Sequence, residues 1–474
     1  MHNFQFPMKQ LILVAGSWIL VSGSNAQTIT QKLQKTFSIF EKDSQLKNAI
    51  SSLYIIDANT GQVVFDKNSR TGLAPASTQK IITSVTAFEL LGKDYRYKTE
   101  LGYEGNIKKD SLDGFIFFRG TGDPTFGSWR YDSTKPAFIF REFINKIKEV
   151  GIKKIGNTLY VDESKFDHNR IPDGWIWQDI GNYYGAGTWG LNWRENQYDL
   201  SLSSGNHIGD EVQIDSKNGE QVYYPVFDNY VKSAAKGTGD NSYIYLPISN
   251  TSAMVNGTIP VNSKKFIISG ATDNAPDYFV DDFRKFLQNE QILKQPDILQ
   301  YTMVYKMLNP GKVIYTHYSP SLDSIIYWFN KKSINLYGES LLKTFAFEKK
   351  GIGSTDSGVV IIQDFWKQKG LDTDEISIVD GSGLSPLNRV TTHAQVEILK
   401  YAKTKDWFSY FYNSLPEYNG MVMKSGTIRG VKGYCGYQKS KNGKEYIFSF
   451  LVNNYNGLPD ALVKKMYKVL DVLK

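Results

Sequence analysis

Ser77 and Lys80 are spaced so that one can serve as a nucleophile and the other as its base. They lie in the segment Pro75-Ala-Ser-Thr-Gln-Lys80, directly ahead of an apolar stretch, residues 81–91, that predicts a helix ending at Gly92. Side chains three residues apart share one face of a helix, so the Lys80 amine would reach the Ser77 hydroxyl. A serine is a weak nucleophile until an adjacent base takes its proton. The pair therefore indicates acyl transfer through an ester on Ser77.

The same spacing occurs elsewhere, and two later segments single out Ser77. Ser-x-x-Lys also begins at Ser44, Ser233 and Ser340. Downstream of Ser77 lie Ser333-Ile-Asn335 and Lys424-Ser-Gly-Thr427. Ser-x-x-Lys, Ser-x-Asn and Lys-Ser/Thr-Gly, in that order, are the signature of penicillin-binding proteins and class A β-lactamases. Of the four serines, only Ser77 has a proline-bounded helix start and lies upstream of both other segments.

Lys80 can act as a base only while its amine is neutral. Burial and a nearby cation both disfavour the charged form of a lysine, and Lys424 is the candidate for that cation. Lys424 can also orient a substrate carboxylate as a compact point charge. An oxyanion hole needs two backbone N–H groups, and those of Ser77 and Thr427 are the candidates.

Three more residues of the later segments predict contacts with the reacting groups. Ser333 can relay a proton to the leaving amine, and Asn335 can hold a substrate amide. Gly426 allows a strand to approach the substrate closely because it has no side chain.

The first 26 residues predict a secretory signal peptide. Lys9 precedes an apolar run, residues 11–21, and Ser24-Asn25-Ala26 offers small residues for cleavage before Gln27. The alternative is a membrane anchor, but this run is much shorter than the ~20 apolar residues that span a bilayer. No cysteine follows it, which excludes lipid attachment there. We expect an exported protein of the periplasm or cell envelope, without a stable membrane span after signal removal.

Composition narrows the class of protein further. A chain of 474 residues is too long for one core, so two or three domains are expected. Cys435 is the single cysteine, which excludes an intrachain disulfide, and the five histidines show no metal-ligand spacing. We expect no metal or other cofactor. The net charge of +7 is mild and is typical of surface composition, and we expect no nucleic-acid partner.

The pattern along the chain predicts a catalytic domain in two parts around an insertion. The first part, residues 27–92, contains a helix at 28–44, strands at 50–58 and 62–66, and the Ser77 helix. The second part, residues 300–474, contains several helices and a hairpin with an Asn-Gly turn at 442–443. Residues 93–299 show many short strands and one clear helix, at 136–150, which predicts one or two β-rich inserted domains.

Beyond the three motifs, further segments resemble those of one known family. They are Gly120-Thr-Gly-Asp-Pro-Thr125, Val161-Asp-Glu-Ser-Lys-Phe-Asp167, Pro172-Asp-Gly-Trp-Ile-Trp177, and Asp380-Gly-Ser-Gly-Leu-Ser385 with Asn388-Arg-Val390. With the motifs, they span nearly all of the chain after the signal. The sequence resembles the D-alanyl-D-alanine carboxypeptidase/endopeptidase family of class C low-molecular-mass penicillin-binding proteins (peptidase family S13, DacB/PBP4 type).

This resemblance implies an α+β fold, with a β-lactamase/transpeptidase-like domain (an antiparallel sheet flanked by helices) and inserted β-rich domains. It implies a serine-type D-Ala-D-Ala carboxypeptidase, also a D,D-endopeptidase, that acts on peptidoglycan stem peptides and cross-links and is acylated by β-lactams. Residue by residue, it implies three catalytic residues, Ser77, Lys80 and Ser333, and five substrate-binding residues, Asn335, Lys424, Ser425, Gly426 and Thr427. Ser425 stands where threonine is commoner and keeps a hydroxyl, and Ile334 stands where aspartate is commoner.

Two other classes of function stay open. A β-lactamase shares the three motifs, but a class A enzyme needs a glutamate-held water, and no short segment between Ser77 and Ser333 stands out as that device. The other alternative is a non-catalytic envelope binding or sensor protein on the same fold, which need not keep all of these polar residues. A long-lived penicillin ester indicates a penicillin target, and a short-lived one indicates a β-lactamase.

Several conspicuous residues favour structural roles. Asp123, Asp162 and Asp380 lie among glycine or turn residues, which favours turn formation over catalysis. Four tryptophans can bind sugars in principle, but buried packing is expected for Trp175, Trp177, Trp189 and Trp193. Because all the acyl-transfer groups lie outside residues 93–299, we expect that region to shape access and substrate choice rather than to perform chemistry, through surfaces at residues 120–126 and 172–184.

Overall fold

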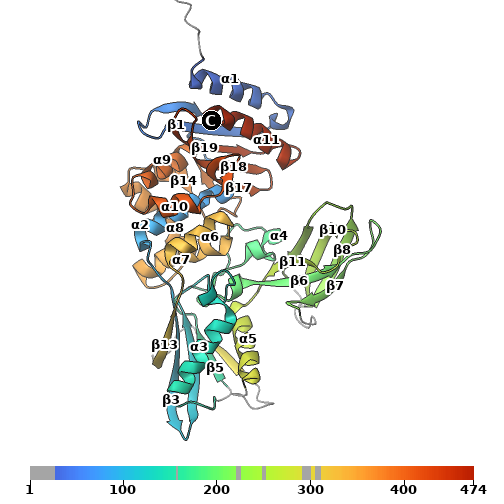
Figure 1. Ribbon diagram of the computed structural model, residues 1–474, viewed down its shortest axis with the longest axis vertical. Coiled ribbons are helices and arrows are strands. Elements are labelled where there is room, and N and C mark those ends of the chain that lie inside the picture. The colour runs from blue at the N-terminus through green and yellow to red at the C-terminus, as the bar shows by residue number, and fades with distance from the viewer. Residues whose placement is uncertain (1–26, 156–157, 220–225, 248–251, 291–299, 305–310) are drawn as a thin grey trace, which may run out of the picture.

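The computed structural model describes residues 27–155, 158–219, 226–247, 252–290, 300–304 and 311–474 (Figure 1). The predicted signal peptide, residues 1–26, lies outside the described residues. The molecule is elongated, with the sheet that joins the two chain ends at one end and the sheet of the inserted region at the other. A smaller β body projects to one side.

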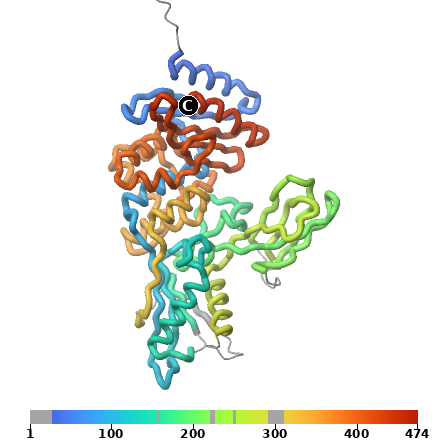
Figure 2. Tube along the Cα trace, viewed as in Figure 1, coloured from blue at the N-terminus to red at the C-terminus, as the bar shows by residue number. Residues whose placement is uncertain are grey.

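The sheet of the catalytic domain has six antiparallel strands in the order β16-β17-β18-β19-β1-β2. Strand β1 pairs with β19 along its whole length, so segments from the two ends of the described chain, residues 50–57 and 446–453, lie side by side (Figure 2). Gly443 at φ +84° makes the predicted turn between β18 and β19. The strands are β1 (Ile50–Asp57), β2 (Val63–Lys67), β16 (Glu417–Tyr418), β17 (Met421–Ile428), β18 (Val431–Lys439) and β19 (Glu445–Asn453).

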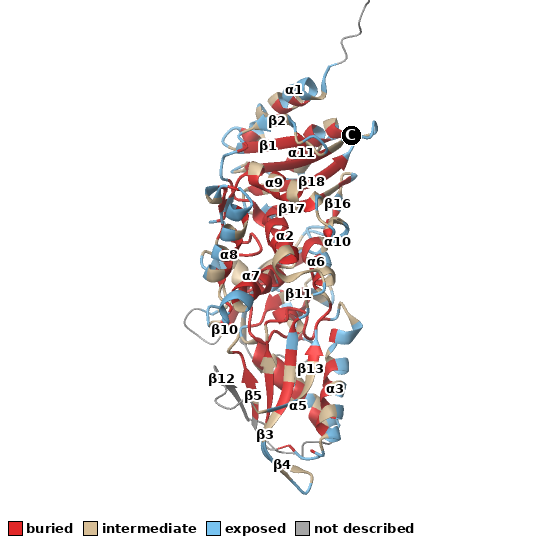
Figure 3. Ribbon diagram, turned by 90° about the vertical axis from the view of Figure 1, so that its left-hand side faces the viewer, coloured by how far each residue is buried: buried red, intermediate tan, exposed pale blue. Residues whose placement is uncertain are grey.

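Helices cover both faces of this sheet. The helices α1 (Ile29–Glu41) and α11 (Pro459–Leu470) pack on one face, where Phe37 and Met466 are buried against the strands. The other face carries a larger helical layer that also buries most of its side chains (Figure 3). It consists of α2 (Lys80–Leu91), α6 (Leu322–Lys331), α7 (Asn335–Lys350), α8 (Thr355–Gln368), α9 (Thr392–Lys403) and α10 (Phe408–Ser414).

Helix α2 begins at Lys80, and Ser77 precedes it in a 3₁₀ turn, η2 (Ala76–Gln79). The helix ends where Gly92 adopts φ +80°, as the sequence predicts. Helix α7 is buried nearly all round over its first twelve residues, because α2, α6 and α8 all pack against it. The short pair β14 (Ile376–Ser377) and β15 (Arg389–Val390) frames the loop at residues 380–385.

The inserted region contains a five-stranded sheet in the order β12-β5-β4-β3-β13, packed against two helices. The second helix, α5, was missed by the sequence analysis, although Phe279, Phe283 and Leu287 form its buried stripe. The elements are β3 (Lys98–Lys108), β4 (Ser111–Gly120), α3 (Pro136–Glu149), β5 (Thr158–Asp162), α5 (Ala275–Asn289), β12 (Gln300–Val304) and β13 (Lys312–Tyr318).

Strand β13 follows residue 299 but pairs with β3 of the inserted region. The predicted boundaries of the inserted region, at residues 93 and 299, therefore remain a proposal. The pairing of β13 with β3 favours an inserted region that ends after Tyr318.

The projecting body is built from two three-stranded sheets, ordered β11-β6-β7 and β8-β10-β9, around a common apolar core. The short helix α4 (Trp177–Ile180) lies between this body and the catalytic domain. The strands are β6 (Gln197–Ser203), β7 (Gln213–Lys217), β8 (Val226–Ala234), β9 (Asn241–Tyr245), β10 (Ser252–Pro260) and β11 (Phe266–Ala271). Over the described part of the chain, none of the helices combines the length and apolar character needed to cross a membrane.

Candidate active site

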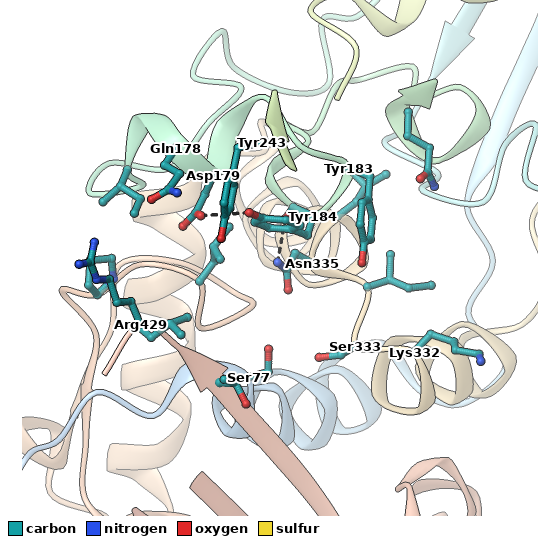
Figure 4. A pocket seen from close by; sticks show the side chains of 18 of the residues that line it. Ser77, Gln178, Asp179, Tyr183, Tyr184, Tyr243, Lys332, Ser333, Asn335 and Arg429 are labelled. Atoms are coloured by element: carbon teal, nitrogen blue, oxygen red, sulfur yellow. Dashed lines mark hydrogen bonds between the residues drawn. The ribbon is translucent and has the colours of Figure 1, made fainter. Parts of the chain in front are cut away.

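The structure brings the three sequence motifs together. Ser77 comes from η2, Ser333 and Asn335 from the junction of α6 with α7, and Lys424 from β17. In Figure 4, Ser77 and Ser333 face each other across the floor of a cleft. The cleft has a volume of about 1090 Å³ and its lining includes Ser77, Ser333, Asn335 and Thr427.

The turn that carries Ser77 holds a strained residue. Ala76, immediately before it, is fully buried at φ +47°, a conformation that residues with a side chain rarely adopt. Strain of this kind persists only where the surroundings fix the backbone. Here Gly383 provides that constraint, because a Cβ atom at Gly383 would lie 2.0 Å from the Ala76 carbonyl oxygen.

The Lys80 amine lies within hydrogen-bonding distance of three oxygens. Its Nζ is 2.9 Å from Ser77 Oγ, 2.6 Å from Asn335 Oδ1 and 2.7 Å from the Ser382 carbonyl oxygen. The last two oxygens can only accept, whereas a hydroxyl can also donate. A neutral amine has two N–H donors and one lone pair. It can therefore donate to the Asn335 and Ser382 oxygens and accept a hydrogen bond from the Ser77 hydroxyl.

Burial and charge favour the same neutral form. Lys80 is fully buried, and desolvation lowers the pKa of its amine well below 10.5. The nearby Lys424 cation lowers this pKa further, whereas Asp380 and Glu339 raise it by a smaller amount. The predicted influence of Lys424 on Lys80 is therefore present in the structure.

Lys424 and Ser333 form a second pair on the other side of Ser77. Lys424 Nζ donates to Ser333 Oγ at 3.0 Å and to the Ser425 carbonyl oxygen at 2.9 Å. Burial lowers the pKa of Lys424 to about 7, so its amine exchanges a proton near neutral pH. Ser333 is held at φ +57°, a second strained residue at the site.

Strand β17 passes unusually close to the Ser77 turn. A Cβ atom at Gly426 would lie 2.6 Å from the Pro75 carbonyl oxygen and 2.9 Å from the Ser77 nitrogen. The prediction that glycine is needed here for close approach is therefore consistent with the geometry. Thr427 follows at the edge of the cleft, where Lys432 Nζ donates to its hydroxyl at 2.8 Å.

The inserted region contributes to the site more than the sequence analysis expected. Asn335 Nδ2 donates to the Tyr184 carbonyl oxygen at 2.7 Å, so a backbone group of this region helps to orient a motif residue. Tyr183, Tyr184 and Tyr243 line the cleft opposite Ser77 (Figure 4). Orienting a motif residue adds to the expected roles of this region in access and substrate choice, and the expectation that it performs no chemistry stays a prediction.

The two predicted access surfaces behave differently. Residues 172–184 reach the cleft, as predicted, through Gln178 and the two tyrosines. Residues 120–126 are almost entirely buried, and a Cβ atom at Gly122 would lie 2.1 Å from the Phe166 ring. The prediction of a surface there is wrong, because this glycine-rich segment is packed closely against a neighbouring aromatic ring.

The structural roles predicted for the three aspartates are confirmed. Asp123 accepts from the N–H and hydroxyl of Thr125, and burial raises its pKa to about 6. Asp162 closes a turn through the Ser164 N–H and pairs with Arg119. Asp380 is fully buried, and its carboxylate accepts from five residues, Gln79, Trp175, Gly383, Ser385 and Asn388.

The tryptophans follow the prediction only in part. Trp189 and Trp193 are buried, whereas Trp175 is half-buried and Trp177 is 43% exposed. Trp177 packs on Tyr245 of β9 and therefore ties α4 to the projecting body. Among the described residues, no group of three or more His, Cys, Asp or Glu side chains could hold a metal ion.

Sequence reasoning missed two groups that contact the motif residues, the Ser382 and Tyr184 carbonyls, and a third, the Glu339 carboxyl group, that binds the loop carrying Ser382. Two are backbone atoms, which no residue pattern reports. Glu339 had a usable signal, since it lies four residues after Asn335 on a predicted helix and so shares its face.

The profile of the D-Ala-D-Ala carboxypeptidase 3 (S13) family matches residues 33–473. This chain belongs to that family. The predicted resemblance is thereby confirmed, as is the prediction of a serine-type carboxypeptidase at the level of the family. A D-alanyl-D-alanine carboxypeptidase of Actinomadura sp. (strain R39) is 25% identical over 475 residues, covering 95% of this chain and 86% of that protein.

Solved structures show the same fold. The crystal structure of penicillin binding protein 4 (dacB) from Haemophilus influenzae superposes with a TM-score of 0.76 at 21% identity, covering 94% of this chain and 99% of that chain. The same protein complexed with a novel β-lactam gives a TM-score of 0.73, covering 94% and 100%. The predicted α+β, β-lactamase/transpeptidase-like fold with additional β domains is confirmed.

Replacing Gly426 by alanine should separate β17 from the Ser77 turn, because the new Cβ would contact backbone atoms that cannot rotate away. We expect a loss of about 1–3 kcal/mol in the free energy of unfolding, measured by thermal or denaturant unfolding. Gly72→Ala is the matched control, since its Cβ would meet only Arg389 Cβ at 3.5 Å. Equal stability of the Gly426 variant and the control would contradict the close approach.

Proposed function

We propose that this protein is an exported D-Ala-D-Ala carboxypeptidase that also cleaves D-alanyl cross-links in peptidoglycan, through an acyl-enzyme on Ser77. The observation that carries the proposal is the 2.9 Å contact between Ser77 Oγ and the buried amine of Lys80. Membership of the S13 family supports the same reaction class. The predicted signal peptide supports a place in the cell envelope, where peptidoglycan is found.

In the proposed acylation, Ser77 Oγ attacks the carbonyl carbon of the penultimate D-alanine while its proton passes to the neutral Lys80 amine. The backbone N–H groups of Ser77 and Thr427 stabilise the oxyanion of the tetrahedral intermediate. The C–N bond then breaks, and the leaving amine takes a proton delivered through Ser333 from Lys424. Water then attacks the ester carbonyl and passes a proton through Ser333 to Lys424. As the ester bond breaks, Ser77 Oγ takes its proton back from Lys80, so both lysines return to their starting states.

Substrate recognition is assigned to groups along the same cleft. Asn335, held between Lys80 and the Tyr184 carbonyl, presents its amide to the peptide. Lys424, Ser425 and Thr427 receive the terminal carboxylate, and Gly426 lets the strand lie close to the scissile bond. A β-lactam would place its ring amide where the scissile peptide bond lies. Attack by Ser77 would then open the ring and leave a covalent ester on Ser77.

The decisive experiment compares the parent with Ser77→Ala on a peptide that ends in D-Ala-D-Ala and on a fluorescent penicillin. We expect the substitution to abolish D-alanine release and penicillin labelling while thermal unfolding stays unchanged. Ser44→Ala, at an exposed Ser-x-x-Lys site, is the matched control and should behave as the parent. Labelling of the Ser77 variant would refute the assignment.

The alternatives make different predictions in the same assay. A β-lactamase would turn over penicillin quickly without releasing D-alanine from the peptide, and a binding protein would form no ester. A long-lived penicillin ester together with D-alanine release distinguishes the proposed function from both.

The pH dependence of acylation should report the Lys80 amine. A base must be unprotonated, so the acylation rate should rise with pH through the Lys80 pKa, whose midpoint lies well below 10.5. Lys424→Gln removes a cation that disfavours the charged form of Lys80, so the midpoint should move to higher pH. Lys332→Gln, which removes a cleft-lining cation that does not act on Lys80, is the control. An unmoved midpoint in the Lys424 variant would contradict the coupling.

Tyr243 of β9 allows the contribution of the projecting body to be tested. It lines the cleft but lies on the wall opposite Ser77, so Tyr243→Ala should weaken the use of a stem-peptide substrate and leave penicillin acylation unchanged. We expect kcat/KM for the peptide to fall about tenfold, equivalent to about 1.4 kcal/mol. Tyr230→Ala, exposed on β8 of the same body, should have no effect. Equal loss on peptide and penicillin would show that Tyr243 supports the chemistry itself.

A further inference from the structure

Glu339 is a buried acid that has no contact with the cleft. It lies on α7 one helical turn after Asn335 and is fully buried. Its two carboxyl oxygens accept from the Gly381 N–H at 3.2 and 3.0 Å, and it also hydrogen-bonds the Ser382 side chain. Burying a carboxyl group costs free energy unless it is hydrogen-bonded. Here both hydrogen-bonding partners, Gly381 and Ser382, belong to one short loop.

That loop, residues 380–385, supplies one of the three oxygens around the Lys80 amine. The Ser382 carbonyl accepts from Lys80 Nζ at 2.7 Å and lies one residue after Gly381, whose N–H donates to Glu339. Glu339 is therefore linked to Ser77 through Ser382 and Lys80. The neighbouring motif residue on the same helix, Asn335, contacts Lys80 Nζ directly at 2.6 Å.

The loop has little freedom to move relative to α7. Thr83 of α2 donates to the Gly381 carbonyl oxygen at 2.7 Å, and a Cβ atom at Gly381 would lie 2.3 Å from the Gly338 carbonyl oxygen. The backbones of the loop and α7 are thus in contact. A change at Glu339 would be transmitted to the Ser382 carbonyl rather than absorbed by intervening side chains.

We propose that Glu339 is a positioning residue for acylation: its hydrogen bonds fix the Ser382 carbonyl, which together with Asn335 holds the Lys80 amine against Ser77. This role rests on the proposed function. It adds to the reaction a residue that touches neither the substrate nor the reacting atoms.

The protonation state of Glu339 indicates whether its charge or its hydrogen bonds position the loop. Burial and the charge of Asp380 raise its pKa to about 8, so its carboxyl group keeps a proton at neutral pH. Lys80 and Lys343 are the lysines that face it, and burial lowers the pKa of both amines. A neutral carboxyl group offers one O–H donor and an acceptor oxygen, and a glutamine amide can supply both an N–H donor and an acceptor oxygen. Hydrogen bonding, rather than charge, is therefore the property that a substitution must preserve.

The test separates the penicillin dissociation constant from the rate constant of acylation by rapid-mixing kinetics at neutral pH. Glu339→Met keeps the side-chain volume but removes both hydrogen bonds. We expect its acylation rate constant to fall about 100-fold, the effect of a small misplacement of a reacting group, with the dissociation constant unchanged. Glu339→Gln should retain a rate constant close to that of the parent.

Lys343→Gln is the matched control for effects on folding alone. Lys343 lies one turn further along α7, is equally buried, and contacts Asp167 Oδ1 at 2.7 Å and the Asn169 carbonyl oxygen at 2.6 Å, away from Lys80. Its variant should lose stability but keep the acylation rate constant of the folded enzyme. If Glu339→Met does not fold, Glu339→Asp replaces it, because the shorter side chain cannot reach the loop.

Three results would overturn the positioning role: a parental rate constant in Glu339→Met, an equal loss in Lys343→Gln, or a loss in Glu339→Gln as large as in Glu339→Met. Each presupposes a parent that penicillin acylates. A parent that forms no ester overturns the proposed function and the role of Glu339 together, so the two failures are distinguishable.

Discussion

The site depends on one polar contact that is withdrawn from water, that between the Lys80 amine and the Ser77 hydroxyl. Moving a charged ammonium group out of water costs several kcal/mol even after the protein relaxes. The oxygens that contact Lys80 Nζ are all neutral, and the charge with the largest effect on its pKa is that of another cation, Lys424. The protein therefore stabilises the neutral amine, which is the form that can remove a proton from Ser77.

Several elements of the molecule contribute to that burial. The pairing of β1 with β19 joins the two ends of the chain into one sheet, and β17 of that sheet lies against the Ser77 turn. Helix α7 adds Asn335, and the loop at residues 380–385 adds the Ser382 carbonyl. The inserted region completes the enclosure through the Tyr184 carbonyl, which explains why a segment without acyl-transfer groups still affects their geometry.

The sequence predicted the motif residues and their convergence because their chemistry lies in side chains at fixed spacing. It also predicted the strands near both ends of the chain, though not their pairing with each other, and the helix that ends at Gly92. It could not predict the Ser382 and Tyr184 carbonyls, since every residue has a carbonyl group and only the fold decides where each points. Helix α5 was missed because its phenylalanines lie within a long aromatic-rich stretch that favoured strands, and tertiary packing against β4 decided the outcome. Trp177 is exposed because α4 is too short to bury it.

The most direct test of this account is the pKa of the Lys80 amine itself. Lysine labelled with ¹³C at Cε allows an NMR titration of the folded protein, and the Lys80 signal is assigned as the one missing from Lys80→Arg. The account predicts that this signal titrates well below the ordinary lysine value of 10.5, while exposed lysines keep theirs. A Lys80 signal that titrates with the exposed lysines would contradict it, because the amine would then be charged at neutral pH and could not serve as the base for Ser77.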